Sequence, residues 1–241
     1  MVNVVVIQAR MGSRRLPGKS LNTLRSKTLI DHVIERAVEV RSADEVVVAT
    51  TDLSEDDILV AHIDNNWKNI VEVYRGSSLD VQSRFLEVAR AKNARLIARY
   101  TADDPFKDPE IFSLGFQMIE KTGADYVSVA TEPIAVGLDV EIFTADALER
   151  ARVEGFSDIA MEHVTTYLRE SKQIARFGLS IPSLQSPPFR LTIDTEKDLE
   201  MMGQLAGAID ELGFENFGHE NTLRAVGWLR ESKGVIIEED F

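Results

Sequence analysis

Short apolar runs alternate with segments of helical period through the first half of the chain. The apolar runs, rich in β-branched or aromatic residues, predict strands at residues 2–7, 45–49, 70–74, 96–99 and 126–129. The segments of helical period between them lie near residues 28–40, 54–66, 79–92 and 108–121. This alternation is typical of βαβ units and predicts an α/β fold with a largely parallel sheet and helices on both faces.

The pattern changes after residue 130. We expect strands at residues 136–144 and 190–194, an extended stretch at 174–181, and helices near 145–152, 157–170, 196–211 and 219–231. No linker, low-complexity tract or internal repeat interrupts the pattern. The prediction is one domain over residues 1–241, with an arm inserted at about residues 131–172.

Composition narrows the class of protein. The 241 residues are 44% hydrophobic and 28% charged, which suits a chain with a sizeable core. A net charge of −13 disfavours general nucleic-acid binding, and no apolar run reaches the roughly 20 residues that span a bilayer. Without cysteine there is no disulfide, Cys-ligated zinc or thiol nucleophile, and the first residues do not resemble a signal peptide. We expect a cytoplasmic enzyme.

Positive charge concentrates in the segment that follows the first strand. Residues 10–19 hold four cations, Arg10, Arg14, Arg15 and Lys19, and no acid. Gly12 and Gly18 allow close backbone approach, and Ser13 offers a hydroxyl, so this basic loop (residues 8–20) suits several phosphates at once. Five residues separate the two glycines, one more than a P-loop has, and no G-x-G-x-x-G occurs. The alternative is a solvated loop that balances an acidic chain.

Acidic residues follow two of the predicted strands. Asp103 and Asp104 come after residues 96–99, and Asp194 ends the predicted strand 190–194, just before Thr195, a helix N-cap candidate. Ligands of such sheets lie beyond the carboxyl ends of the strands. Asp103 and Asp194 could hold Mg²⁺ against a polyphosphate bound by the basic loop. Each acid alone could equally be a turn or cap residue, Asp104 more so than Asp103.

Two more acids, Asp139 and Glu141, alternate with apolar residues in the predicted strand 136–144. A period of two places both carboxylates on one face. They could bind sugar hydroxyls, or form the solvated face of an edge strand.

The segments named so far, with several others, resemble the signature of CMP-sugar synthetases. These are cytidylyltransferases of the acylneuraminate and 3-deoxy-manno-octulosonate type, and the resemblance is to their SpsF-like branch of spore-coat polysaccharide biosynthesis. The matching segments occur in the family's order at residues 7–19, 29–36, 48–52, 75–84, 103–109, 137–143, 162–165 and 194–199. The family often has an arginine where Met161 stands, which points toward a less anionic acceptor.

The resemblance implies a Rossmann-like fold of the nucleotide-diphospho-sugar transferase type. It implies transfer of CMP from CTP to a small acidic sugar of the 2-keto-3-deoxy type, with release of pyrophosphate and a requirement for Mg²⁺. It also implies a homodimer formed through the inserted arm.

Site residues follow from the matched motifs. The resemblance places the nucleotide at Ala9, Arg10, Gly12, Ser13, Arg15, Lys19, Arg75, Ser77 and Asp80. It places the metal at Asp103 and Asp194, and the acceptor sugar beside Asp139, Glu141, Glu162 and His163. The residues that act on the reacting phosphates are Arg10, Lys19 and Asp103.

Three alternatives to this reaction remain. One is nucleotidyl transfer to a sugar phosphate, and another is a glycosyltransferase that uses a nucleotide sugar. The glycosyltransferase lacks support because the chain contains no D-x-D motif. The third is a nucleotide-binding module without turnover, which intact Lys19, Asp103 and Asp194 argue against.

Overall fold

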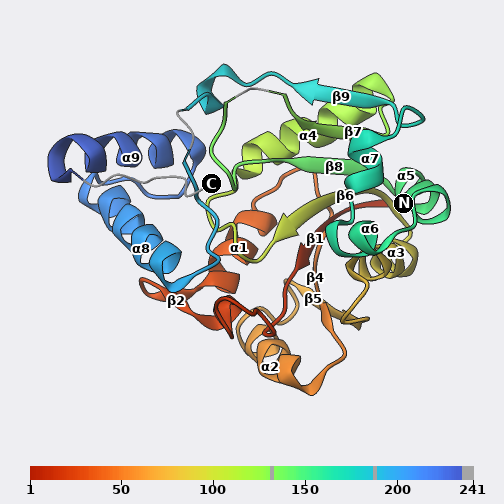
Figure 1. Ribbon diagram of the computed structural model, residues 1–241, viewed down its shortest axis with the longest axis horizontal. Coiled ribbons are helices and arrows are strands. Elements are labelled where there is room, and N and C mark those ends of the chain that lie inside the picture. Colours follow the sequence, from red (N-terminus) through yellow and green to blue (C-terminus); the bar gives the residue numbers. More distant parts are fainter. Residues whose placement is uncertain (131–132, 187–188, 235–241) are drawn as a thin grey trace.

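The computed structural model describes residues 1–130, 133–186 and 189–234. Within them a seven-stranded sheet has the order β5-β4-β1-β6-β8-β7-β9 (Figure 1). Neighbouring strands are parallel except at β8, which is antiparallel to both β6 and β7. The predicted α/β class with a mostly parallel, mixed sheet is confirmed.

The elements have the following bounds. The strands of the sheet are β1 (Val2–Gln8), β4 (Glu45–Thr51), β5 (Glu72–Gly76), β6 (Ala94–Thr101), β7 (Tyr126–Val129), β8 (Glu141–Thr144) and β9 (Arg176–Leu179). A separate antiparallel hairpin consists of β2 (Thr23–Leu24) and β3 (Lys27–Thr28). The helices are α1 (Leu29–Val38), α2 (Asp57–Asn66), α3 (Val81–Ala91), α4 (Pro109–Thr122), α5 (Ala145–Glu154), α6 (Asp158–His163), α7 (Thr166–Glu170), α8 (Glu196–Glu211) and α9 (His219–Lys233). Short 3₁₀ turns are η1 (Lys19–Leu21), η2 (Ser54–Asp56) and η3 (Pro182–Leu184). In the described ranges no helix has both the length and the apolar character needed to cross a bilayer.

Helices cover both faces of the sheet, as predicted. Alternate residues of β1 point to opposite faces, so Val5 and Ile7 join the core beneath α1, α4, α8 and α9. Val4 and Val6 join the core beneath α3, α5 and α7. All four are fully buried, and each such side chain contributes roughly 1.5–3 kcal/mol to folding. This burial on both faces explains why β1 reads as a continuous apolar run.

The parallel strands bring four loops to one edge of the sheet. Because β1, β4, β5 and β6 run in the same direction, the segments that follow them all lie at their carboxyl ends. These segments are the basic loop, residues 52–56, 77–80 and 102–108. Candidate chemistry therefore concentrates at this edge.

The structure corrects the sequence analysis after residue 130. The strand expected at 136–144 is only Glu141–Thr144, and residues 190–194 form no strand. In the latter segment the backbone bonds alternate between partners: Leu191 N donates to Val136, and Ile193 N donates to Asp103. The helix expected at 157–170 is two helices, because Val164 between them has a φ of +54°. The strand expected at 70–74 is displaced to Glu72–Gly76.

The predicted arm contains β8 and α5–α7, and its residues 131–132 lie outside the described part. Helices α5 and α6 pack against α3 of the same chain. The prediction of a single domain and the role of the arm in dimerisation remain predictions.

Candidate active site

The basic loop has a fixed backbone. Ala9 N donates to Ala49 O at 3.2 Å, which continues the pairing of β1 with β4. Gly18 N donates to Met11 O at 2.9 Å and closes the loop. Gly18 has a φ of +74°, a conformation that residues with a Cβ rarely adopt. This turn delivers Lys19 to the start of η1, at the edge of the sheet.

Asp56 fixes the backbone of the basic loop through a hydrogen bond from Met11 N. This carboxylate is fully buried, and its Oδ1 accepts from Met11 N at 2.6 Å. Its Oδ2 accepts from Thr50 Oγ1 at 3.0 Å and from Thr51 N at 3.1 Å, at the end of β4. The sequence analysis missed this contact, since an acid in the first turn of a helix reads as a cap. Asp56 instead joins the basic loop to a neighbouring strand end.

Lys19 lies between the two predicted metal carboxylates. Its Nζ donates to Asp103 Oδ2 at 2.6 Å, to Asp194 Oδ1 at 3.1 Å and to Ile193 O at 3.2 Å. The three charged side chains are 14%, 24% and 12% exposed, in the order Lys19, Asp103, Asp194. The predicted convergence of these three residues, 84 and 175 positions apart in sequence, is confirmed. We call Lys19, Asp103, Asp194 and Ile193 O the Lys19 cluster.

Two further cations face Asp194. Arg15 Nη2 lies 2.9 Å from Oδ1, and Arg190 forms an ion pair with Oδ2. Burial of the Asp194 carboxyl acts to raise its pKa, but the charge and hydrogen bond of Lys19, with the charges of both arginines, lower the pKa below its ordinary value. Asp194 is therefore ionised at neutral pH. Capping by Thr195, whose hydroxyl accepts from Asp198 N, confirms the predicted N-cap and starts α8 directly after Asp194.

The neighbouring Asp104 belongs to a buried network. Its Oδ1 accepts from Thr192 Oγ1 at 2.7 Å and its Oδ2 from Thr101 Oγ1 at 2.6 Å. The Nζ of Lys107, whose side chain is 2% exposed, lies 3.2 Å from Asp104 Oδ2 and 3.1 Å from Asp139 Oδ1. Lys107 also donates to Asp139 O at 2.9 Å. We call Lys107, Asp104 and Asp139 the Lys107 cluster. It joins the loop that carries Asp103 to the segment of Asp139, and the bond from Thr192 joins the same loop to the segment before α8.

Burial separates the pKa values within this cluster. Burial raises the pKa of Asp104, while the charge of Lys107 lowers the pKa of Asp139. Burial alone would lower the pKa of Lys107, but the two carboxylates reverse this and raise it. The Lys107 ammonium therefore keeps its charge, and Asp104 is more than the turn residue that the sequence suggested.

Gly137 lets the chain pass close to this cluster. It has a φ of +102°, and an added Cβ would lie 3.1 Å from Thr192 Oγ1 and 3.3 Å from Asp104 Oδ1. The turn it makes ends the extended conformation expected at 136–144, so only Glu141 of the two alternating acids lies in a strand. The strand expected at 136–144 therefore does not include Asp139, and the placement of both carboxylates on one face stays a prediction.

Glu141 is the centre of a second polar network. Its carboxylate is buried and accepts from Arg99 Nη1 at 2.6 Å. It also accepts from the hydroxyls of Tyr126 and Thr165, each at 2.7 Å. Burial, followed by the charge of Glu141, raises the pKa of Tyr126, which keeps that hydroxyl a donor. Arg99 Nε in turn donates to Gln8 Oε1 at 3.1 Å at the end of β1.

The other two predicted acceptor residues lie on α6. Glu162 and His163 are exposed at the end of this helix. Val164, the next residue, is buried, and its carbonyl accepts from Gln82 Nε2 at 3.3 Å on α3. The structure thus holds the end of α6 against α3, with its last side chains exposed.

The predicted nucleoside residues have structural partners. Arg75 donates to Thr51 O and Asp57 Oδ1, at 3.0 and 2.6 Å. Ser77 Oγ accepts from Asp80 N at 3.1 Å, and Asp80 caps α3. These contacts fix the segment after β5, and nucleotide binding by Arg75, Ser77 and Asp80 stays a prediction.

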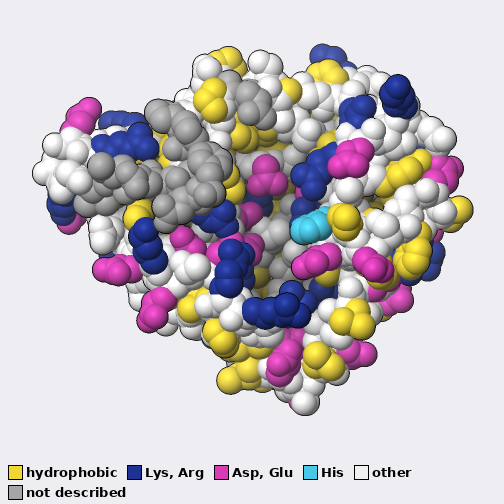
Figure 2. All heavy atoms as spheres, viewed as in Figure 1, with side chains coloured by type: hydrophobic (Ala, Val, Ile, Leu, Met, Phe, Trp, Pro, Cys, Tyr) yellow, Lys and Arg dark blue, Asp and Glu magenta, His cyan; other side chains and the backbone are white. Residues whose placement is uncertain are grey.

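The remaining predicted residues belong to the basic loop. Arg10 is exposed, and Ser13 Oγ accepts from Leu16 N at 3.4 Å. A Cβ at Gly12 would lie 2.5 Å from Glu55 Oε1, so a side chain there displaces Glu55. The face drawn in Figure 2 shows Lys and Arg side chains around a hollow near the middle of the view. By comparison with Figure 1, this face presents the carboxyl edge of β1 and β6.

Arg84 was not among the expected site residues. It is 2% exposed, and its Nη1 donates to Ala49 O at 3.0 Å, beside the start of the basic loop. Burial, and then the positive charge of Arg10, lower the pKa of Arg84 to about 10. Among the described residues, Arg84 Nε and Gln82 Oε1 are buried without a hydrogen-bond partner. Both lie in the matched segment 75–84, where Arg84 is part of the family's motif, but the resemblance assigned neither of them a role.

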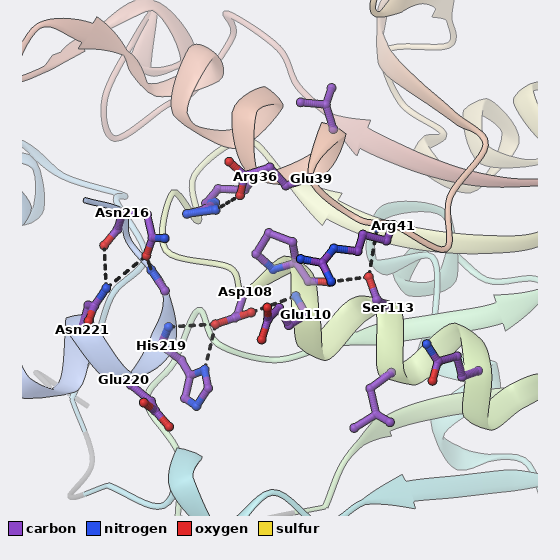
Figure 3. Close-up of a pocket in the computed structure, with 15 residues that line it drawn as sticks. Arg36, Glu39, Arg41, Asp108, Glu110, Ser113, Asn216, His219, Glu220 and Asn221 are labelled. Carbon is purple, nitrogen blue, oxygen red and sulfur yellow. Dashed lines mark hydrogen bonds and ion pairs between the residues drawn. The ribbon is translucent and has the colours of Figure 1, made fainter. Parts of the chain in front are cut away.

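A separate polar groove lies between α1, α4 and α9 (Figure 3). Its volume is about 970 Å³. Asp108, the N-cap of α4, accepts there from His219 N at 2.9 Å and from His219 Nδ1 at 2.7 Å. Burial opposes ionisation of Asp108, but these hydrogen bonds lower its pKa to about 2. No member of the Lys19 cluster lines this groove, and its contacts join α9 to α4.

The Lys19 cluster has the donor set of a divalent-cation site. Across the described ranges no group of three or more His, Asp or Glu is placed to hold a metal. Magnesium, however, commonly takes only one or two protein carboxylates, and phosphate oxygens and waters complete the shell. Here two carboxylate oxygens and a carbonyl oxygen already surround one positive centre, the Lys19 ammonium. The residues present therefore fit a hard divalent cation.

The chain is similar to known cytidylyltransferases in sequence and in fold. The spore coat polysaccharide biosynthesis protein SpsF of Bacillus subtilis is 38% identical over 207 residues, covering 83% of this chain and 84% of that protein. A cytidylyltransferase from Leptospira borgpetersenii has a TM-score of 0.83 and 26% identity, over 100% of this chain and 99% of that one. A CMP:2-keto-3-deoxy-manno-octonic acid synthetase complexed with CTP has a TM-score of 0.63 and 21% identity, over 86% and 99%. A family model described as cytidylyltransferase matches residues 4–222. The chain belongs to the cytidylyltransferase family.

Proposed function

We propose that this protein is a cytoplasmic enzyme that transfers CMP from CTP to a sugar acid of the 2-keto-3-deoxy type, for surface polysaccharide biosynthesis. The observation that carries the proposal is the Lys19 cluster, at the carboxyl edge of the sheet and beside the basic loop. The similarity to SpsF supports the role in polysaccharide synthesis, and the CTP-bound relative supports the nucleotide. The family membership of the chain supports the reaction type.

The basic loop binds the triphosphate in this proposal. Arg10, Arg15 and Lys19 supply charge, and Ser13 supplies a hydroxyl donor. The backbone at Ala9 and Gly12 approaches the nucleotide, since both lie where β1 ends. Positive charge at these positions stabilises the negative charge that builds on the departing pyrophosphate.

Asp103 and Asp194 hold the metal, which we propose to be Mg²⁺. When bound, it neutralises charge on the phosphates and polarises the α-phosphate. The two carboxylates come from segments joined by the hydrogen bond from Thr192 Oγ1 to Asp104 Oδ1, at 2.7 Å, and by the bond from Ile193 N to Asp103 O, at 2.9 Å. Their spacing is therefore set before substrate arrives.

The two substrates lie on either side of this centre. Arg75 at the end of β5, and Ser77 and Asp80 after it, face the nucleoside. Asp139, Glu141, Glu162 and His163 line the acceptor side, where Glu141 fixes Arg99. The acceptor hydroxyl oxygen forms a bond to the α-phosphorus, and the bond from that phosphorus to the α,β-bridging oxygen breaks. Pyrophosphate leaves with the electron pair, the hydroxyl proton passes to solvent, and catalysis consists of positioning and charge stabilisation.

Pyrophosphate release tests this reaction. CTP, ATP, GTP and UTP are each incubated with Mg²⁺ and a panel of 2-keto-3-deoxy sugar acids and sugar phosphates. We expect release with CTP and a sugar acid, and its loss in Asp103→Ala. Preference for a sugar phosphate would overturn the acceptor class, and tight CTP binding without any release would indicate a binding module.

We also propose that the protein is a homodimer formed through the arm. Four exposed apolar side chains lie on neighbouring elements. Leu79, just before α3, is 83% exposed, and Val153, on α5, is 81% exposed. Phe156, between α5 and α6, is 58% exposed, and Ile159, on α6, is 63% exposed. The ion pair between Asp80 and Arg152, at 2.7 Å, joins the loop before α3 to α5. Several exposed large apolar side chains on neighbouring elements of a monomer are typical of an interface.

Light scattering after size exclusion measures the oligomeric state. We expect a dimer for the natural chain and a monomer for Ile159→Asp. The matched control is Ile58→Asp on α2, at a side chain of 59% exposure, which should stay dimeric. A monomer for the natural chain at tens of micromolar would contradict the proposal.

A further inference from the structure

The Lys19 ammonium has used all its hydrogen-bonding capacity in this structure. An ammonium has three N–H donors, and Lys19 Nζ has three acceptors within 3.2 Å, namely Asp103 Oδ2, Asp194 Oδ1 and Ile193 O. Its side chain is 14% exposed. In this arrangement Lys19 has no N–H left for a phosphate.

The same arrangement leaves little attraction for a divalent cation. Asp103 and Asp194 carry two negative charges, and Lys19, Arg15 and Arg190 bring three positive charges to them. The cluster is neutralised without a metal. A divalent cation placed between these carboxylates would meet the Lys19 ammonium at the same point, where like charges repel strongly.

We propose that Lys19 and the divalent metal are alternative occupants of one position. Before nucleotide binds, the Lys19 ammonium fills the metal position and holds Asp103 and Asp194 together. The triphosphate then attracts Lys19 and Arg15 away from the carboxylates, which frees these oxygens for the metal. The inference rests on the proposed function, because it takes a nucleoside triphosphate and its metal as the ligands.

The backbone supports an exchange that involves side chains alone. The turn at Gly18 and the bond from Gly18 N to Met11 O fix the position from which Lys19 extends. The Arg15 side chain is 64% exposed and free to reorient. Asp103 and Asp194 are fixed separately, through Asp104 and Thr195. Metal and triphosphate therefore bind with positive coupling, since each removes an obstacle to the other.

Titration with Mn²⁺ alone, read by electron paramagnetic resonance of the free ion, tests the exchange. No nucleotide or acceptor is present. We expect Lys19→Met to bind one Mn²⁺ at least tenfold more tightly than the natural chain. Arg14→Met, which removes the same charge from an exposed position in the same loop, should bind Mn²⁺ as the natural chain does. Adding Asp103→Asn to Lys19→Met should abolish the gain.

Lys19→Gln provides the same readout if Lys19→Met does not fold, because its amide keeps a hydrogen-bond donor. A Lys19 variant whose Mn²⁺ affinity is unchanged or weaker would overturn the exchange. So would a natural chain that binds Mn²⁺ alone as tightly as the variant. If the Lys19 variant gains Mn²⁺ affinity but the natural chain releases no pyrophosphate from CTP with any acceptor, the exchange stands and the proposed reaction fails.

Discussion

Two lysines, each between two aspartates, differ in what surrounds them. The Lys19 cluster uses Asp103 and the Lys107 cluster uses Asp104, which is the next residue in the chain. Lys107 is 2% exposed and completes a network closed by threonine hydroxyls. Lys19 is 14% exposed and lies beside a loop of exposed arginines. Successive carboxylates in one turn thus have different roles: one is available to a ligand, and the other fixes the turn.

Removing the buried lysine should give the largest effect. Lys107→Met leaves the buried Asp104 carboxyl without its cation, and breaking such a pair typically costs about 3–5 kcal/mol of unfolding free energy. Urea unfolding followed by circular dichroism measures it. Lys19→Met should cost less, about 1 kcal/mol, because its carboxylates are partly solvated and Asp194 keeps two arginines.

A double variant sharpens this result. Asp104→Asn in the Lys107→Met background removes the carboxyl that has lost its cation and should recover part of the lost stability. Equal destabilisation by Lys107→Met and Lys19→Met would remove the distinction between the two clusters.

For activity we expect the Lys19 cluster to matter more than the Lys107 cluster. Asp103→Ala should lose about 3 kcal/mol or more of transition-state stabilisation, as measured by kcat/KM for pyrophosphate release. Its unfolding free energy should change by about 1 kcal/mol at most, because Asp103 is 24% exposed. A variant with near-normal kcat in Mg²⁺ would remove Asp103 from the metal site.

Asp108, the third aspartate of the loop that carries Asp103 and Asp104, makes the stability of the protein depend on pH. Asp108 has a pKa of about 2 in the folded protein, below the ordinary 3.8. It therefore stabilises the fold above pH 4, by about 2 kcal/mol, and this contribution is lost as the pH falls from about 4 toward 2. The pKa of His219 is raised mainly by its hydrogen bond to Asp108, so the contribution of His219 is present below pH 6.5 and is lost as the pH rises through its folded value.

Unfolding free energies of the natural chain and Asp108→Asn, measured between pH 7 and pH 2.5, test this contribution. The gap between the two proteins should shrink as the pH falls below about 4. A gap that stays constant across this range would show that Asp108 titrates as a free carboxyl.

The difference between the clusters also marks what a sequence can reveal. Strands such as β1 and β4 were predicted because both of their faces are buried, which leaves a continuous apolar run in the sequence. Asp103 was placed correctly because β6 is parallel to β1, so the rule for strand ends applies. Asp194 was placed correctly although its predicted strand does not exist, since Thr195 starts α8 there.

The rest depends on contacts between distant residues. Lys107 and Asp56 leave no periodic signal that reveals their distant partners, Asp139 and Met11, which lie 32 and 45 positions away in sequence. The segment before α8 pairs its backbone with Val136 and Asp103 in turn, so no local pattern could assign it to a strand or a loop. The sequence of this chain therefore does not reveal the buried polar groups whose partners are distant in sequence.

The smallest expected effect is a difference between the binding of CTP and the binding of CMP when Lys19 is removed. In the proposed reaction its ammonium contacts the part of CTP that leaves as pyrophosphate, so Lys19→Ala should weaken CTP binding about tenfold and CMP binding much less. A hydrogen bond to a charged group contributes roughly 1.5–3 kcal/mol, and part of that is offset here because Lys19 first gives up its contacts with Asp103 and Asp194. Isothermal titration of both nucleotides with Mg²⁺ measures the ratio, with Arg14→Ala as the control for loss of charge. Equal weakening of CTP and CMP would place Lys19 away from the β- and γ-phosphates, and would leave the ammonium with the same fixed role as that of Lys107.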